Sequence, residues 1–470
     1  MSKTPHIQYL CGFKEHGKFL YHYKFIVTIS PRWCIIKLAN KTTVKELIVI
    51  YRQELIKDIR LFTSQPVAKF YDSLFLHLDL SSVPLHSGTG RKGFSAHAMI
   101  RAFIVMKCEG LSMITEPVDY LNNNLLIAHY CGFDILRPLP SCWTFARFLK
   151  KFNHDVLSDI WKKQVLFLAK KGIIDTSFIG LDSTPVFANT SQNNPKSFLS
   201  NKLKKNNQPK ADKDCRLGVY TASNRTNEKK AAFYWGYKNH VLVDCISGLP
   251  IYEMTTTAEV ADVTVALDIL ARTHAFLPLT ECTFLADKGY DAKNIYNKVD
   301  ELYNGECLIP LNKRNTKNLE LLPHGNPVCE AGLAMWKDGK FSDRGRTRQK
   351  FCCPLKSAKD ADCPCHHKNF YNGRKHRGCT KYITIPDDLR SSIDRSGSYF
   401  KSHYSLRMEC ERYNSRFKNT GQERMWVRNL SSVTNLNTLA HISLLAVAVA
   451  TVVSKSGQSY RKLKTVKRTA

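Results

Sequence analysis

A short stretch at residues 404–418, YSLRMECERYNSRFK, carries two interleaved patterns. At about 100° per residue on a helix, a polar set falls between roughly 300° and 360°, and an apolar set falls between roughly 180° and 240°. The polar stripe consists of Tyr404, Arg407, Glu411 and Lys418. The apolar stripe consists of Leu406, Cys410, Tyr413 and Phe417. The apolar stripe predicts a face packed in a core, which leaves one carboxylate and two cations facing something else.

Two further carboxylates directly follow apolar runs. Asp182 lies in GLDST and Asp287 lies in FLADKGY. A carboxylate at the end of a buried strand is costly unless it meets a metal, a cation or water. A single acid of this kind is ordinarily a loop cap, but two on neighbouring strands, together with Glu411, predict a shared site.

Carboxylates that converge suit a particular chemistry. Two or three of them can hold Mg²⁺ or Mn²⁺ ions about 3.5–4 Å apart, where one ion activates the attacking oxygen and the other stabilises the leaving one. Ligands that are all oxygen favour Mg²⁺ over zinc. Asp182, Asp287 and Glu411 therefore predict a two-ion site for in-line phosphoryl transfer.

The charge of the chain predicts the partner. The 470 residues include 70 Lys plus Arg against 40 Asp plus Glu, a formal net charge of +30. The segment 192–216 has seven basic residues and two acids, and 455–470 has six basic residues and no acid. Such clusters favour a polyanion, because binding releases its counterions, although any single cluster also suits a solvated basic face.

The chain between residues 172 and 314 alternates in character. Strands are predicted at 178–188, 237–248, 249–258, 282–290 and 307–313, and helices at 262–274 and 292–302. Three strands followed by alternating helix and strand predict a mixed sheet with helices packed on its faces.

Short helices are predicted ahead of this sheet, at 97–112, 116–133 and 140–152. The last contains Thr144, Arg147, Lys150 and Lys151, so it suits either a helix that contacts DNA or a core helix with solvated lysines. Residues 1–90 stay unassigned, although 44–58 has helical spacing.

The segment 315–399 is basic, rich in Cys and His, and poor in apolar periodicity, so we interpret it as an insertion. Thiolate and imidazole at short spacing are ligands for tetrahedral zinc, but the spacing matches no standard finger, and free thiols are the alternative. The zinc candidates are Cys352, Cys353, Cys363, Cys365 and Cys379.

Neither a membrane nor an oxidising compartment is predicted. The most apolar run, at 442–453, is shorter than the ~20 residues that span a bilayer, so we expect a buried helix there. No signal peptide is visible at the start, and the 16 cysteines are then expected to be reduced thiols.

The three acidic motifs together resemble a known family. LDST at Asp182, LADKGYD at Asp287 and the stretch at 404–418 are similar to the Asp-Asp-Glu (DDE) transposases of bacterial insertion sequences. The resemblance covers roughly 175–450. It is closest to the branch with a Tyr-x2-Arg-x3-Glu-x6-Lys signature, which Tyr404, Arg407, Glu411 and Lys418 match in full.

The resemblance implies a fold and an activity. The fold is α/β and ribonuclease-H-like, a five-stranded mixed sheet with helices on both faces, preceded by an N-terminal helical domain. The activity is that of a transposase, which cleaves double-stranded DNA at its element's ends and joins the 3′-hydroxyls to target DNA. Asp182, Asp287 and Glu411 are then the catalytic metal ligands, while Tyr404, Arg407 and Lys418 contact the terminal DNA backbone.

The expected organisation follows from these motifs. It comprises an unassigned region (1–90), a helical DNA-binding domain (91–155), a catalytic domain in two parts (172–314 and 400–455), the insertion (315–399) and a basic tail (456–470). We expect a homodimer in the DNA complex and a cytoplasmic, nucleoid-associated bacterial protein. The alternatives are a ribonuclease-H-like nuclease without strand transfer and a catalytically silent DNA-binding derivative.

Overall fold

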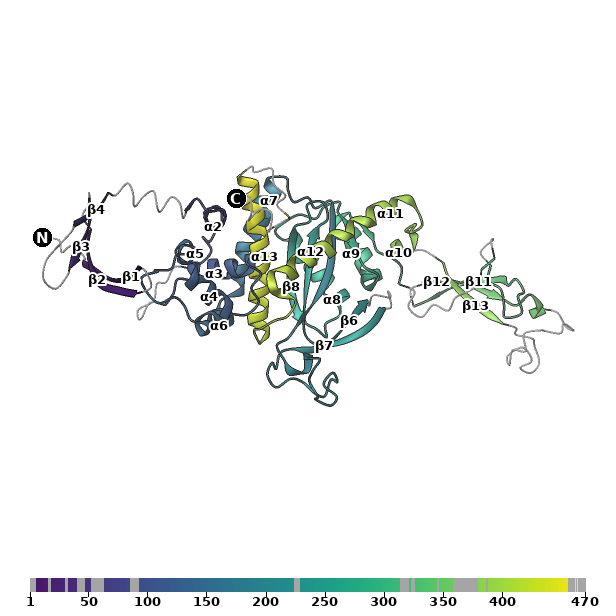
Figure 1. The fold of residues 1–470 in the computed structure, drawn as a ribbon. Coiled ribbons are helices and arrows are strands. Elements are labelled where there is room, and N and C mark those ends of the chain that lie inside the picture. Colours follow the sequence, from purple (N-terminus) through teal and green to yellow (C-terminus); the bar gives the residue numbers. More distant parts are fainter. Residues whose placement is uncertain are drawn as a thin grey trace.

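The computed structural model describes the chain with gaps. The described residues are 6–15, 18–29, 33–39, 47–51, 63–84, 93–223, 229–312, 321–322, 326–344, 346–357, 379–385, 388–454, 461 and 463, and those within 6–51, 221–223 and 229–230 are described as backbone alone. Four bodies follow one another across the molecule: an N-terminal sheet, a helical region, a mixed sheet and a second small sheet (Figure 1).

The central sheet carries the acidic motifs. Its strands are β5 (Phe178–Phe187), β6 (Arg216–Ser223), β7 (Lys229–Asp244), β8 (Pro250–Thr257), β9 (Thr283–Ala286) and β10 (Glu306–Leu308). They run in the order β10-β9-β5-β7-β6, and β8 pairs with β7. β5, β9 and β10 are mutually parallel, whereas β7 is antiparallel to β5, β6 and β8. The predicted mixed sheet is therefore present.

The number of strands differs from the prediction. Each of the five predicted strands has a counterpart, but β6 makes a sixth by pairing with the first half of the long strand β7. β6 begins inside the basic cluster at 192–216, where charged and polar residues hide the alternation that marks a strand. The sheet is covered by the predicted helices α8 (Asp262–His274) and α9 (Lys293–Tyr303) and by the later helices described below.

Helices precede this sheet. They are α2 (Pro66–Leu76), α3 (Ala96–Cys108), α4 (Thr115–Asn123), α5 (Leu125–Cys131), α6 (Cys142–Lys151) and α7 (His154–Lys170). The single helix predicted at 116–133 is two helices, because Asn124 leaves helical geometry at φ −130°. α2 and α7 were not predicted, although Asn153 caps α7 by accepting a hydrogen bond from the Asp155 amide.

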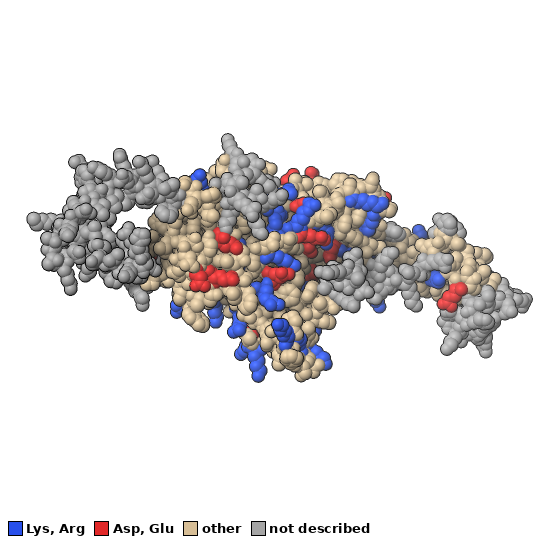
Figure 2. Space-filling model, in the orientation of Figure 1, with Lys and Arg blue, Asp and Glu red and all other residues tan. Residues whose placement is uncertain are grey.

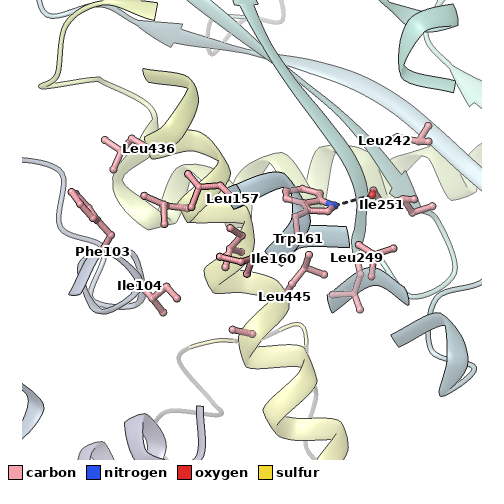
Figure 3. Packing of buried hydrophobic residues seen from close by; sticks show 14 of the residues in the cluster. Phe103, Ile104, Leu157, Ile160, Trp161, Leu242, Leu249, Ile251, Leu436 and Leu445 are labelled. Atoms are coloured by element: carbon pink, nitrogen blue, oxygen red, sulfur yellow. Dashed lines mark hydrogen bonds between the residues drawn. The ribbon is translucent and has the colours of Figure 1, made fainter. Parts of the chain in front are cut away.

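The C-terminal helix α13 (Leu430–Val453) joins the two regions. It packs against α3, α6 and α7 on one side and β8 on the other (Figure 1). Figure 3 shows Leu436 and Leu445 of α13 among core residues of α3, α7 and the sheet, where the Trp161 indole donates to the Ile251 carbonyl at 2.9 Å. α13 is the only described helix long and apolar enough to cross a membrane, and 89% of its apolar window is buried. This agrees with the predicted buried helix.

One weak prediction near the N-terminus is wrong. The described backbone of residues 6–51 forms an antiparallel sheet of β1 (His6–Glu15), β2 (Lys18–Ile29), β3 (Trp33–Ala39) and β4 (Leu47–Tyr51). β4 lies within 44–58, where helical spacing was noted. Its sequence, LIVIY, is dominated by β-branched and aromatic residues, which favour a strand over a helix.

The insertion holds its own sheet. β11 (Trp336–Asp343), β12 (Arg346–Cys352) and β13 (Thr380–Thr384) are antiparallel and project away from the helical region (Figure 1). Cys329, Met335, Phe351 and Cys379 form a small core beside it.

Candidate active site

The sheet register brings the two aspartates together. β5 and β9 are parallel, with Leu181 opposite Ala286. Asp182 is the next residue on β5, and Asp287 is the next residue after β9. The ends of adjacent parallel strands meet at one edge, so the two carboxylates are neighbours. Asp287 also caps the short helix η2 (Lys288–Tyr290), with one oxygen accepting from the Gly289 amide at 2.7 Å.

The third carboxylate comes from α12 (Met408–Phe417), which packs on β5 and β7. The apolar stripe lies where it was predicted: Cys410, Tyr413 and Phe417 are fully buried, and Leu406 packs against the same cluster. The single helix assumed for 404–418 needs correction. α11 (Ser398–Tyr404) passes through the tight turn η4 (Ser405–Arg407) into α12, which widens into the π-helical turn η5 (Lys418–Gln422).

Gly180 allows this helix to approach the sheet. It lies on β5 two residues before Asp182, under the side chains of Cys410 and Cys245. A Cβ atom at this position would overlap the Cys410 sulfur and lie 2.7 Å from the Cys245 sulfur. A larger residue would therefore push α12, and Glu411 with it, away from Asp182.

Gly180→Ala is accordingly expected to lower the free energy of unfolding by about 1–3 kcal/mol, the usual cost of overpacking a core. Gly93→Ala is the control, because a Cβ atom there meets nothing within 4 Å. Urea denaturation of both variants is the measurement. Equal stability of the two variants would mean that α12 does not need the close approach.

Asp182 is buried in an unfavourable environment for its charge. The pKa of its carboxyl is raised to about 6, mainly by burial and also by the nearby Asp287 and Glu411 carboxylates, against the opposing effect of Arg407. The Asn414 amide donates to its Oδ2 at 3.0 Å. Asn414 was not predicted, yet it falls at roughly 280° on the helical wheel, directly beside the polar stripe. Its own Oδ1 is buried without a hydrogen-bond partner.

Arg407 lies between the carboxylates. Its Nη1 donates to Glu411 Oε1 at 2.7 Å, and its side chain is 15% exposed while that of Glu411 is 61% exposed. Burial acts to lower the pKa of Arg407, but the charges of Asp182, Tyr404 and Glu411 outweigh burial and raise it. Tyr404 is half-buried in the same place; burial raises its pKa, and all three carboxylates add to that effect. The structure thus brings together five of the six predicted catalytic and DNA-contacting residues.

Lys418, the sixth, lies about two helical turns beyond Glu411, at the start of η5. Its ammonium group is 3.9 Å from the Glu423 carboxylate. η5 ends next to a segment that runs beside the end of β5, where the Met425 amide donates to the Phe187 carbonyl at 2.8 Å. The chain from Lys418 to Met425 therefore links α12 to the strand that bears Asp182.

Two transposase family models match this chain. A family model described as Transposase DDE domain matches residues 171–446, more than half of the chain, and one described as Transposase domain (DUF772) matches 61–151. The chain belongs to the DDE transposase family. No curated protein matches the sequence. Among solved structures, a piggyBac transposase synaptic complex with hairpin DNA, determined by cryo-EM, matches at 10% identity and TM-score 0.36, over 88% of this chain and 78% of that chain. This similarity is too low to support a conclusion about the fold or function of this chain.

The acidic site of this transposase fits a divalent cation by its donor chemistry. It offers only oxygen ligands, and a bound cation would stabilise the charge of the buried Asp182 carboxylate, whose pKa is raised mainly by burial and to a lesser extent by the neighbouring Asp287 and Glu411. Among the described residues, however, no three acid, His or Cys side chains converge at metal-binding spacing. The ion pair with Arg407 accounts for the orientation of Glu411.

The charge of Asp182 has a consequence for the stability of the transposase. Because its pKa is higher in the folded state than the ordinary value, the folded state binds the proton more tightly, and stability is lost as the pH rises from about 4 to about 6. Asp182→Asn should therefore stabilise the metal-free protein at pH 7, by up to about 3 kcal/mol, and should change little at pH 4. Melting temperatures in a chelator at both pH values would check this. A stability gain that is the same at pH 4 would refute the explanation.

The structure has two cavities of similar size, one with several acidic residues in its lining and one with aromatic and basic residues in its lining. One of ≈ 500 Å³ lies between β10 and α11 and is lined by Asp300, Glu306 and Asp394, which makes it unsuited to DNA. The other, of ≈ 470 Å³, lies at the end of β5. Phe187, Tyr220, Phe233, Lys202 and Arg424 are part of its lining.

The zinc candidates are only partly described. Cys352, Cys353 and Cys379 are buried at the junction of β12 and β13, where the Cys353 amide donates to the Cys379 carbonyl at 3.0 Å. Cys363 and Cys365 lie outside the described residues. Zinc binding in the insertion therefore stays a prediction.

Proposed function

We propose that this chain is the transposase of a bacterial insertion sequence, which cleaves the ends of its element and joins the freed 3′-hydroxyls to target DNA. The observation that carries the proposal is the arrangement at the sheet edge: Asp182 and Asp287 side by side, with Arg407 and Glu411 of one helix beside them. The Tyr-Arg-Glu-Lys spacing supports the branch with that signature, and the mixed sheet fits a ribonuclease-H-like fold.

Asp182, Asp287 and Glu411 would hold Mg²⁺ or Mn²⁺, two ions in all. When bound, the metal supplies Lewis-acid stabilisation of the attacking and leaving oxygens of a phosphodiester. The side chains of the protein supply the rest. Asn414 fixes the orientation of the Asp182 carboxylate, and Arg407 is positioned to exchange Glu411 for a DNA phosphate, which would release Glu411 toward the aspartates.

We expect the bound DNA to continue away from this site along a series of cations. Lys418 follows the catalytic helix, and Arg424 lies beyond it on the rim of the ≈ 470 Å³ cavity. The loop between β5 and β6 contributes Lys202 to the same rim. In Figure 2, Lys and Arg side chains gather on the lower protrusion, beneath β7, that this loop forms. The aromatic rings lining the cavity suit stacking with a base, and the cations suit the phosphates.

The helical region is the second proposed DNA contact. On α6, Trp143, Arg147, Lys150 and Lys151 are all exposed, whereas Phe145 and Leu149 are buried. The exposed set repeats at spacings of 4, 3 and 1, so it shares one face of the helix, and the side chain of Trp143 is 75% exposed. We therefore favour a helix that contacts the DNA backbone over the alternative of a core helix with solvated lysines, because the basic face also carries an exposed aromatic residue.

The experiment that tests the function begins with DNA flanking the gene. Inverted repeats found there would be placed on a duplex and incubated with the protein, Mg²⁺ and a target plasmid. We expect cleavage at the repeat and covalent joining of its 3′ end to the target, by proteins acting as a homodimer. Cleavage without joining would favour the nuclease alternative, and binding without cleavage the silent derivative. Association with the bacterial nucleoid in the cytoplasm follows from the same activity.

Zinc in the insertion is a separate prediction. If thiolates among Cys352, Cys353, Cys363, Cys365 and Cys379 bind it, protein purified under reducing conditions should carry close to stoichiometric zinc. A chelator should then expose the insertion to protease before the central sheet. Elemental analysis that finds no zinc in reduced protein would contradict zinc binding by the insertion.

A further inference from the structure

A buried lysine joins the helical region to the turn that bears Lys418. Lys107, near the end of α3, is fully buried. Its ammonium nitrogen lies 3.1 Å from Oε1 of Gln422 in η5 and 3.3 Å from the carbonyl of Leu111. Gln422 is itself buried, and its amide nitrogen donates to the Leu436 carbonyl of α13 at 2.7 Å. Lys107 thus reaches across from one family-matched segment, 61–151, into the other, 171–446.

The backbone around this contact is built for close approach. Gly421 has φ +84°, and a Cβ atom there would lie 2.8 Å from the Leu111 carbonyl oxygen. On the other side of the contact, a Cβ atom on Gly110 would lie 3.1 Å from the Asn419 carbonyl oxygen. The turn after α3 and the turn η5 therefore meet backbone to backbone, with Lys107 as the polar link between them.

The buried lysine is costly, so filling space in the core is a poor explanation for it. Burial, only partly offset by the charge of Glu116, lowers the pKa of Lys107 to about 7. An apolar side chain would fill the same space without this penalty. What an apolar side chain cannot do is donate to Gln422 and Leu111 at once, which fixes η5 in one position.

We propose that Lys107 is a positioning residue: it holds η5, and with it Lys418, in the geometry that meets the DNA end. The inference rests on the proposed function for the role of Lys418, but the docking itself does not. The helical region then influences how the catalytic domain binds DNA. It does so through the contact of Lys107 with Gln422, which involves neither DNA nor the catalytic carboxylates.

Hydrogen exchange tests the docking without DNA. Lys107→Met removes both hydrogen bonds and keeps much of the volume, and Met99→Ala is the matched control, since Met99 is a buried core residue of the same helix. We expect the amides of residues 418–422 to exchange at least tenfold faster in Lys107→Met relative to those of α13, and this ratio to stay unchanged in Met99→Ala. The same ratio in both variants would overturn the inference.

The salt dependence of DNA binding tests the consequence. Each phosphate contact contributes about 0.9 to the slope of log affinity against log salt concentration. On a duplex carrying the terminal repeat, Lys418→Ala should flatten the slope by about that amount, Lys107→Met should do the same, and the double variant should add nothing. A wild-type slope for Lys107→Met would refute positioning of Lys418. A wild-type slope for Lys418→Ala would remove Lys418 from the proposed DNA contact, while the exchange experiment still decides the docking.

Discussion

Replacing Asp182, Asp287 or Glu411 with alanine is expected to abolish cleavage and joining, each with a loss on the order of 10³-fold or more, because a metal ligand supports several kcal/mol of transition-state stabilisation. Binding of the DNA ends should survive, since the cations of the site, and not its acids, attract phosphate. The measurements are single-turnover cleavage in Mg²⁺ and the dissociation constant for an end duplex.

The matched control is a carboxylate outside the site. Asp268 is exposed on α8 and forms an ion pair with Arg272 of the same helix, so Asp268→Ala removes a charge without touching the sheet edge. It should cleave at the wild-type rate. If one of the three site variants also cleaved at nearly that rate, its residue would not belong to the site. If all three lost DNA binding, the loss of cleavage would reflect misfolding and not chemistry.

The sequence indicated the parts of this site that depend on local pattern. An apolar run ending in an acid marks a strand end, and the 3.6-residue period of 404–418 separates the buried face of α12 from the face that carries Arg407 and Glu411. The resemblance to DDE transposases then assigned the roles. Local pattern cannot predict the register between strands. The structure shows that Leu181 lies opposite Ala286, which brings Asp182 and Asp287 together.

The features that sequence reasoning missed depend on contacts between distant segments. Gly180 matters because α12 packs over it, and Lys107 is fully buried against η5, and neither contact can be inferred from the residues that flank these positions in the sequence. Asn414 had a detectable signal, because it lies beside the polar stripe, but an amide carries no charge to draw attention. β6 was not predicted for two reasons. It pairs with the first half of β7, which was not predicted to be a strand, and it begins at Arg216, the end of the basic segment 192–216.

The two stripes of the opening helix predict opposite effects of mutation. Phe417 is fully buried and stacks on His441, with ring centroids 4.3 Å apart. Phe417→Asp would bury an unpaired charge and leave a cavity, so we expect a loss of more than about 4 kcal/mol of stability and a protein that does not fold at 37 °C. Leu406→Asp should cost less, because Leu406 is only partly buried.

On the polar stripe, the chemistry of the side chain should matter more than its charge. A guanidinium can bind a phosphate with two parallel hydrogen bonds, which an ammonium cannot reproduce. Arg407→Lys should therefore slow end cleavage by about 10- to 100-fold, the value of one or two charge-assisted hydrogen bonds, while the melting temperature changes little. Lys418 acts as a point charge at a partly exposed position, so Lys418→Arg should be tolerated better. Tyr404→Phe should cost less than Tyr404→Ala, because the ring that stacks on Phe400 is kept.

Melting temperature and single-turnover cleavage, measured side by side on both sets, separate these effects. The apolar variants should lose stability first, and cleavage only as a result. The polar variants should lose cleavage at unchanged stability. If Arg407→Lys melted early while Phe417→Asp folded normally, α12 would face the other way, and the ion pair of Arg407 with Glu411 would be structural. If Arg407→Lys cleaved as fast as the wild type, a single positive charge would suffice, and the two-pronged phosphate contact would be wrong even though the orientation of the helix is right.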